Sequence, residues 1–447
     1  MSSLRDFLDE LPADELLHVT QRIEPDYYKT ALALELDARQ RSPVIQFDQP
    51  AGWDVPIVTN LFADRSRIAR MIGTDRAGFN ASFAHALQNL VPAVMRAAGP
   101  VHEVVQTGDD VDVQRLPISR HFEGDAGRYI SSGVLVCKDP DTGVRNLSFQ
   151  RLQMKGPNRF GASLHSRGHI WEHLQRSEAR GKNLEVAVVI GCHPAIYLAG
   201  AAKVAMDVDE FAVAGALMKR PVELVKCKTI DVEVPAEAEY VLEGELLAGV
   251  LEDEGPFGEY TGYSTYRSTR NVFVVKAITR RAQPIFLDIV PGLSNEHLLL
   301  GRSAKEALVF TRLKELVPNL VALNYPKSGT HFHAYLSLRK SAEGQARHAL
   351  LLLLGLDNYI KFAVAVDADV DVYQDAEVMW AMATRFQADT DMFMVPKVFC
   401  NRLDPSSVDG MSAKLGIDAT APLNSEVQRT ALPPEATAWA REFLNQH

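Results

Sequence analysis

Cysteine is scarce in this chain of 447 residues and is spread widely along it. The four cysteines are Cys137, Cys192, Cys227 and Cys400, and no two of them form a CxxC pair. Such spacing argues against a disulfide framework or a zinc knuckle and is typical of proteins from a reducing compartment. We therefore expect a cytoplasmic protein.

Basic charge and long apolar runs are also lacking. Lysine and arginine number 47 against 57 aspartates and glutamates, which gives a net charge of −10. Nucleic acids and anionic membrane surfaces require a basic footprint, so neither is an expected partner. The longest aliphatic run, Ala349–Leu354, ends at Gly355. It is far shorter than the roughly 18 apolar residues that a membrane span requires.

Several common functional motifs are missing. The chain contains no GxGxxG dinucleotide motif, no GxxxxGK[ST] phosphate loop and no GxSxG nucleophile elbow. Asp367, Asp369 and Asp371 have the spacing of a calcium loop, but Val372 stands where that loop requires glycine. These absences disfavour four familiar classes of binding or catalytic site.

The length and the ordinary apolar fraction of 47% predict a globular protein of two or three domains. Strand-like and helix-like patterns change along the chain and predict an α+β fold. Helices are expected over 3–17, 27–41 and 64–72, a strand over 146–154, and a loop over 404–418. The predicted domains are a mixed N-terminal α/β region (1–105), a central split β-barrel-like domain (106–295) and a C-terminal α/β domain with a terminal helix (296–447).

Two glutamates bracket a turn-forming segment in the central region. Glu254 and Glu259 enclose Gly-Pro-Phe-Gly, whose composition predicts a tight turn that can bring the two carboxylates together. Close like charges raise one pKa and can turn a carboxyl group into a proton donor near neutral pH. A solvated acidic loop explains these residues equally well.

A second candidate segment is Arg145–Arg151. On one regular strand, Asn146 and Arg151 would face opposite sides, although a bulge could bring both to one pocket. A buried arginine needs a carboxylate partner, and Glu254 or Glu259 would serve. An exposed arginine at a sheet edge is the alternative.

Histidines at positions 165, 169 and 173 would share one face of a helix. Two of them could bind a metal ion, but the HExxH motif is absent. Structural histidines are therefore the favoured interpretation from the spacing alone.

Taken together, five ordered segments resemble the UbiD family of prenylated-FMN-dependent decarboxylases, and the resemblance extends over nearly the whole chain. The segments are Asn146–Arg151, Val225–Pro235, Glu254–Tyr263, Val366–Arg385 and Lys414–Thr420.

The resemblance implies a cofactor set and its ligands. Family members bind prenylated FMN, a divalent metal (Mn²⁺, or Mg²⁺) and K⁺. The metal ligands would be Asn146, His169 and Glu210. The flavin site would include these residues together with Gln150, Arg151 and Lys414. Lys203 lies where relatives often carry a Pro-x-Pro element.

The resemblance also implies a Glu-Arg-Glu catalytic network. Glu254 would hold Arg151 against the substrate carboxylate, and Glu259 would return a proton to carbon after CO₂ leaves. His297 and Arg302 could hold a second carboxylate or a ring oxygen. The implied reaction is reversible, non-oxidative decarboxylation of an aromatic, furan-type or α,β-unsaturated acid, with a flavin prenyltransferase as the cofactor supplier.

Two other functions remain open from the sequence. Glu254 and Glu259 could serve as the acid and base of a metal-dependent hydrolase without flavin. The chain could also be a non-catalytic flavin-binding oligomer. A homo-oligomer, either dimer or hexamer, is expected from the resemblance, with the C-terminal domain as the assembly domain.

Overall fold

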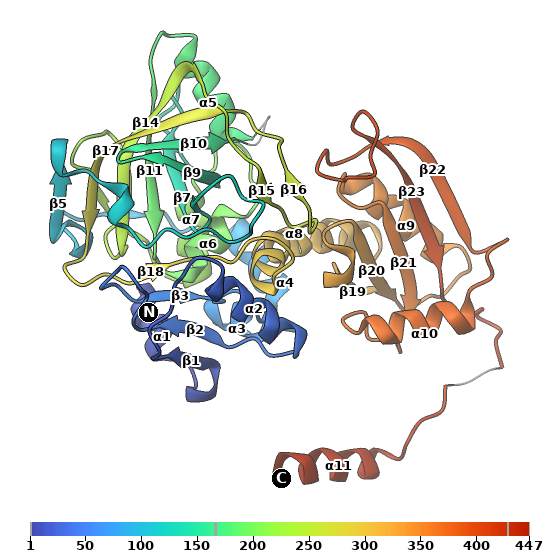
Figure 1. Ribbon diagram of the computed structural model, residues 1–447. Helices are drawn as coiled ribbons and strands as arrows, with labels where there is room; N and C mark the ends of the chain where they lie inside the picture. The colour runs from blue at the N-terminus through green and yellow to red at the C-terminus, as the bar shows by residue number, and fades with distance from the viewer. Residues whose placement is uncertain (1, 165–167, 427–428, 447) are drawn as a thin grey trace.

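The structure is a computed structural model that describes residues 2–164, 168–426 and 429–446. His165 lies outside the described residues. In Figure 1 the N-terminal region and the central sheet form one body, and the C-terminal domain forms a second. The long helix α8 (Asn295–Leu316) lies between them. This arrangement confirms the predicted α+β fold.

The N-terminal region packs helices against a small mixed sheet. Its strand order is β1-β2-β3-β18, so a strand from the end of the central region completes it. The elements are α1 (Leu4–Asp9), β1 (Leu16–Val19), α2 (Tyr28–Ala38), β2 (Val44–Phe47), β3 (Ile57–Thr59), α3 (Arg65–Met71), α4 (Phe79–Gln88) and β18 (Phe286–Leu287).

The central region is built on a nine-stranded sheet with the order β6-β9-β10-β17-β14-β11-β7-β8, and β5 pairs with β17. The large-sheet strands are β5 (Val104–Thr107), β6 (Tyr129–Ile130), β7 (Val134–Lys138), β8 (Arg145–Phe149), β9 (Arg151–Gly156), β10 (Arg159–Ser163), β11 (Leu184–Ile190), β14 (Tyr240–Leu251) and β17 (Asn271–Arg280). Smaller strands are β4 (Val94–Met95), β12 (Glu223–Lys226), β13 (Glu233–Pro235), β15 (Phe257–Gly258) and β16 (Ser264–Thr265). The helices are α5 (His169–Glu178), α6 (Pro194–Gly200) and α7 (Glu210–Met218).

The large sheet curls because its two ends are joined in sequence. Strand β8 is the last strand at one end, whereas β9 lies second from the other end. Only Gln150 separates them in the chain. One residue can span such ends only if the sheet bends round into a half-barrel. The single strand predicted over 146–154 is therefore two strands, which places Asn146 and Arg151 on different elements.

The C-terminal domain is an α/β sandwich with the strand order β19-β20-β21-β23-β22. Helix α11 stands away from the body at the end of an extended segment (Figure 1). The elements after α8 are β19 (Leu320–Asn324), β20 (His333–Leu338), α9 (Gln345–Leu356), β21 (Phe362–Asp367), α10 (Asp375–Arg385), β22 (Met392–Phe399), β23 (Met411–Asp418) and α11 (Pro434–Gln446).

Two predicted segments differ from the structure. The helix expected over 3–17 ends at Asp9, and Leu16–Val19 runs parallel to β2 instead. Pro12 lies between these elements and has no N–H with which to continue a helix. The loop expected over 404–418 is wrong in its second half, since Met411–Asp418 forms β23, paired with β21 and β22. Within the described chain, no helix is both long enough and apolar enough to cross a bilayer.

Candidate active site

Arg151 holds both glutamates of the turn segment. It begins β9, and the glutamates flank the short strand β15. Its guanidinium donates to both carboxylate oxygens of Glu254, at 3.0 and 2.9 Å, and to Oε1 of Glu259 at 2.9 Å. The side chains are 9%, 0% and 14% exposed for Arg151, Glu254 and Glu259, respectively. The structure thus brings the three predicted catalytic residues into one shielded cluster.

Glycines make room for this cluster. A Cβ at Gly161 on the neighbouring strand β10 would lie only 3.1 Å from Cγ of Glu254. Gly255 has a φ of +90°, a conformation that other residues rarely adopt, and turns the chain directly after Glu254. The Phe257 ring lies 5.1 Å from the Arg151 guanidinium carbon and covers it.

Arg151 is paired more fully with Glu254 than with Glu259. Burial alone would lower the pKa of Arg151, but the bonds to Glu254 and the charge of Glu259 raise it above its ordinary value. Glu254 uses both oxygens on this guanidinium, whereas Oε2 of Glu259 accepts no hydrogen bond from a described residue. Glu259 is therefore the carboxyl group with an oxygen available to a substrate.

A second cluster brings together the three predicted metal ligands. Asn146 lies on β8, while His169 and Glu210 are the first residues of α5 and α7. Asn146 Nδ2 lies 2.9 Å from Glu210 Oε1 and 3.3 Å from His169 Nδ1. Asp209 accepts a hydrogen bond from the Phe211 N–H and so caps α7, which fixes Glu210 in the first turn.

This cluster has the chemistry of a cation site. Burial raises the pKa of Glu210 to about 8, so the buried carboxylate lacks a compensating positive charge. Oδ1 of Asn146 is buried without a partner in the described chain. Burial also lowers the pKa of His169, which favours the neutral imidazole that a metal requires. An amide oxygen, a carboxylate and one imidazole suit Mn²⁺ or Mg²⁺.

The other histidine candidates do not join this cluster. No group of three His, Cys, Asp or Glu side chains with the geometry of a metal site occurs among the described residues, so Asn146 is needed to complete the set. His173 lies one turn after His169, with the two ring centroids 6.5 Å apart, and is buried.

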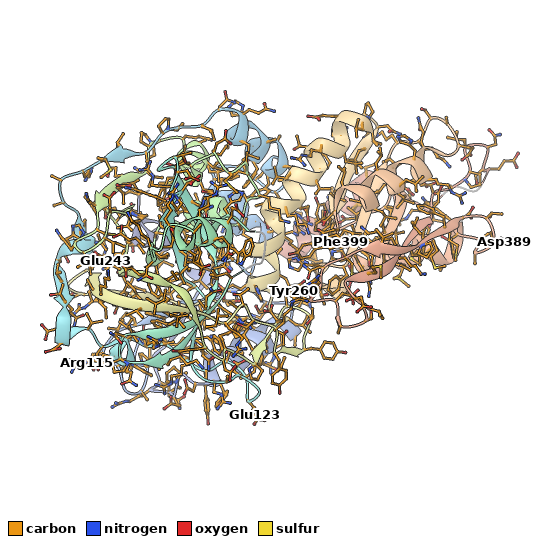
Figure 2. The ribbon with its side chains drawn as sticks, turned by 90° about the horizontal axis from the view of Figure 1, so that it is seen from above. Arg115, Glu123, Glu243, Tyr260, Asp389 and Phe399 are labelled. Carbon is orange, nitrogen blue, oxygen red and sulfur yellow. The ribbon has the colours of Figure 1, made fainter. Side chains whose placement is uncertain are left out.

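The predicted substrate residues His297 and Arg302 both lie on α8, and His297 lies near the glutamate turn. Ser294 caps this helix by accepting the N–H of His297. The His297 ring meets Tyr260 edge-on, with 6.2 Å between centroids, and Tyr260 directly follows Glu259. Figure 2 shows Tyr260 beside the gold ribbon of α8, at the junction of the two bodies. Arg302 is 4% exposed, and its Nε and Nη1 have no partner in the described chain.

The lysine predicted at the flavin lies in the C-terminal domain. Lys414 is on β23, and its Nζ donates to the carbonyl oxygens of Leu354 and Asp357 at the end of α9. Lys203 comes closer to the domain junction, where its Nζ lies 5.4 Å from the Tyr359 ring.

Lys305 and Tyr359, both at this junction, were missed from the sequence. Lys305 Nζ lies 3.4 Å from the Tyr359 ring and 2.8 Å from Asp357, and burial lowers its pKa to about 8. Its spacing of three residues from Arg302 puts both cations on one face of α8, which is a signal that sequence inspection could have used.

Comparisons with known proteins identify the class. Three domains described for 3-octaprenyl-4-hydroxybenzoate carboxy-lyase match: the N-terminal domain over residues 11–87, the Rift-related domain over 93–294 and the C-terminal domain over 298–419. The chain therefore belongs to the UbiD family and is a carboxy-lyase, that is, a decarboxylase.

Three relatives, one of them in two forms, illustrate the similarity. The UbiD-class enzyme HmfF from Pelotomaculum thermopropionicum, solved with FMN, is 39% identical with a TM-score of 0.94, covering 99% of this chain and 100% of its own. An evolved dimeric form of HmfF, solved with prFMN, is 37% identical with a TM-score of 0.90, covering 97% and 98%. The apo 3,4-dihydroxybenzoic acid decarboxylase of Klebsiella pneumoniae is 27% identical with a TM-score of 0.92, covering 99% and 100%. Anhydromevalonate phosphate decarboxylase of Methanothermobacter thermautotrophicus is 33% identical over 94% of this chain and 97% of its own.

Proposed function

We propose that this chain uses prenylated FMN to decarboxylate an aromatic, furan-type or α,β-unsaturated carboxylic acid reversibly and without oxidation. The observation that carries the proposal is the shielded Glu254–Arg151–Glu259 network. A hydrolytic acid–base pair would need no arginine held by two carboxylates, whereas a carboxylate substrate needs a fixed cation to orient it.

The cofactor proposal is supported by the cluster of Asn146, His169 and Glu210. These residues would hold Mn²⁺ or Mg²⁺, and K⁺ is the proposed monovalent cation. Gln150, Arg151 and Lys414 are the further proposed flavin contacts. When bound, the cofactor supplies the electron sink that side chains cannot provide for the carbanion left by CO₂. HmfF has been solved with both FMN and prFMN, which supports the same choice here. A flavin prenyltransferase would supply the cofactor.

The protein's own residues orient the acid and move one proton. Arg151, kept charged by Glu254, binds the substrate carboxylate. The bond between the ring or alkene carbon and the carboxyl carbon breaks, and CO₂ leaves. Glu259 then transfers its proton to the same carbon and becomes a carboxylate. Its side chain is the most exposed of the three, and its Oε2 accepts no hydrogen bond from a described residue, which suits it to this role. The same steps run backward at high CO₂.

The substrate contacts proposed on α8 are His297 and Arg302. The two unpartnered nitrogens of a buried guanidinium support Arg302, because such groups are costly unless a ligand satisfies them. These residues would hold a second carboxylate or a ring oxygen. One relative is named anhydromevalonate phosphate decarboxylase, so a phosphorylated acid is a further candidate substrate.

A substrate screen tests this proposal. Protein co-expressed with a flavin prenyltransferase should release CO₂ from one class among benzoic, furan and cinnamic acids. Metal-dependent hydrolysis by protein that holds no flavin would instead favour the hydrolase alternative. Bound flavin with no CO₂ release from any class would favour the non-catalytic oligomer.

Assembly as a homo-oligomer, dimer or hexamer, is proposed for the C-terminal domain. Helix α11 exposes Trp439 and Leu444, 66% and 73% exposed, and Trp439 stacks on Phe443 at 5.6 Å. Such an apolar patch on a helix apart from its own fold favours contact with a second copy.

Replacing Trp439 and Phe443 together by serine should therefore lower the assembled mass by at least half, measured by light scattering after gel filtration. Leu251→Ser, at the exposed end of β14, is the matched control and should leave the mass unchanged. An unchanged mass in the double variant would exclude α11 from the interface.

A further inference from the structure

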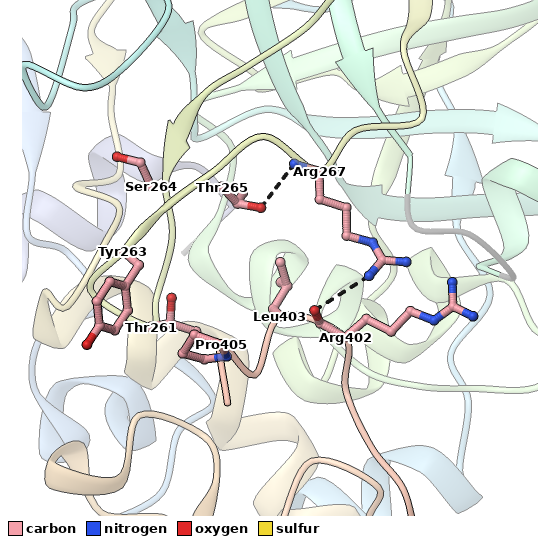
Figure 3. Close-up of a pocket in the computed structure, with 8 residues that line it drawn as sticks. All are labelled: Thr261, Tyr263, Ser264, Thr265, Arg267, Arg402, Leu403 and Pro405. Atoms are coloured by element: carbon pink, nitrogen blue, oxygen red, sulfur yellow. Dashed lines mark hydrogen bonds between the residues drawn. The ribbon is translucent and has the colours of Figure 1, made fainter. Parts of the chain in front are cut away.

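A pocket of about 350 Å³ opens between the central and C-terminal domains. Figure 3 shows its walls, one from the loop around β16 and the other from the loop between β22 and β23. Its lining includes Thr261, Tyr263, Thr265, Arg267, Arg402 and Leu403. The size is that of a small-molecule site, and the lining combines hydroxyl-bearing and arginine side chains with the apolar Leu403 and Pro405.

Two arginines face this pocket without acidic partners. Neither Arg267 nor Arg402 forms an ion pair in the described chain. Among the described residues, the Arg267 guanidinium donates only to the Arg402 carbonyl, at 3.5 Å. Arg270, in the same loop, is paired with Asp253 at 2.8 Å. Figure 3 shows the two guanidinium groups on the same side of the pocket.

Two like charges that face one pocket from its two walls repel one another. Burial and the positive charge of Arg402 together lower the pKa of Arg267. An anion between them would remove this repulsion. Guanidinium groups present paired N–H donors that match the oxygens of a carboxylate or phosphate, and the hydroxyl groups of Thr261 and Thr265 line the same space.

The pocket shares a wall with the Glu-Arg-Glu network. The Arg267 carbonyl oxygen accepts a hydrogen bond of 2.9 Å from Nη2 of Arg151. A Cβ at Gly255 would lie 3.4 Å from the Thr265 carbonyl and 3.5 Å from Arg151 Nη2. The Arg267 backbone is thus in direct contact with the guanidinium that would orient the substrate carboxylate.

We propose that Arg267 and Arg402 bind a second oxyanion of the substrate, a phosphate monoester or a distal carboxylate, across the two domains. This rests on the proposed decarboxylation, since it places the second anion on the acid held by Arg151. The site is separate from His297 and Arg302, because it lies on the two loops rather than on α8, and it leaves those two residues to contact a ring oxygen. The enzyme then prefers acids with two anionic groups.

Calorimetric titration of the full chain with inorganic phosphate and, separately, with furan-2,5-dicarboxylate tests this site. Arg402→Gln and Arg267→Gln should each lower the affinity for the more tightly bound of the two ligands by about 10–100-fold, as expected for loss of a charge-assisted contact. Arg402→Lys should recover part of this affinity. Arg339→Gln, an exposed arginine in the C-terminal domain, is the matched control and should bind as the unaltered chain does.

The tighter ligand identifies the source of the oxyanion. Tighter phosphate binding points to a phosphorylated acid, and tighter dicarboxylate binding points to a dicarboxylic acid. Equal affinity in the unaltered chain and Arg402→Gln, or binding of neither ligand, would overturn the proposal. Failure of the decarboxylation would appear separately, as intact ligand binding with no CO₂ release from any acid.

Discussion

Glu259→Gln should reduce CO₂ release by about 10²–10⁴-fold while the protein still folds and binds flavin. General acids contribute a factor of this size, and a carboxamide cannot donate a proton to carbon. Glutamine can still accept the hydrogen bond that Arg151 gives to Oε1 of Glu259. The cluster therefore keeps its shape while it loses its proton. CO₂ release measured on flavin-loaded protein, with the flavin absorbance as the loading check, gives the result.

The matched control is Glu252→Gln, two residues before Glu254. Glu252 also bonds an arginine, Arg159, but its carboxylate is 36% exposed and stands outside the cluster. Its loss should change turnover less than twofold, because an exposed ion pair contributes little. Equal activity in Glu259→Gln and the unaltered protein would exclude Glu259 as the proton donor.

Glu210→Gln should abolish divalent metal binding and leave the melting temperature of the metal-free protein close to that of the unaltered chain. Burial raises the pKa of Glu210 to about 8, so at neutral pH the metal-free site already holds much of its carboxyl in the protonated form that glutamine resembles. With metal present the negative charge becomes essential. Loss of an outer partner of a metal ligand costs about 10–100-fold in affinity, so loss of this charged ligand should cost more than ~100-fold.

Metal content after dialysis against Mn²⁺, together with thermal melting with and without the ion, provides the measurement. Glu172→Gln is the control, since Glu172 lies on the same helix as His169 but is 40% exposed and bonds Arg176. That variant should be stabilised by Mn²⁺ as the unaltered chain is. Full Mn²⁺ retention by Glu210→Gln would mean that the ion binds elsewhere.

The sequence predicted the local features of the site well because they are short and chemically distinctive. From the sequence alone, Arg151 needs a carboxylate partner, and the two glutamates around Gly-Pro-Phe-Gly are the candidates for it. The expectation of a single strand over 146–154 was wrong, however. Gln150 separates two strands that lie near opposite ends of a curled sheet. The order of strands in a sheet depends on pairing between residues far apart in the chain.

Non-local packing explains the other differences. Strand β23 begins just after a loop rich in Asp, Pro, Ser and Gly, and it is a strand because β21 and β22 flank it. The contact between Lys305 and Tyr359 joins α8 to the segment after α9, and only the tertiary fold reveals it. The contact of Arg267 with Arg402 likewise joins two domains, and only the tertiary fold reveals it. The domain boundaries at 105 and 295, and the roles assigned to the site residues, stay predictions.

The central claim, decarboxylation that depends on prenylated FMN, is tested most directly by comparing two preparations of the unaltered chain. One is expressed with a flavin prenyltransferase and one without, and each is incubated with Mn²⁺, K⁺ and the best acid from the screen. CO₂ released and acid consumed are then measured together. The account predicts one CO₂ per acid consumed in the first preparation and almost none in the second. Equal rates in both preparations, or acid consumed without CO₂, would contradict it.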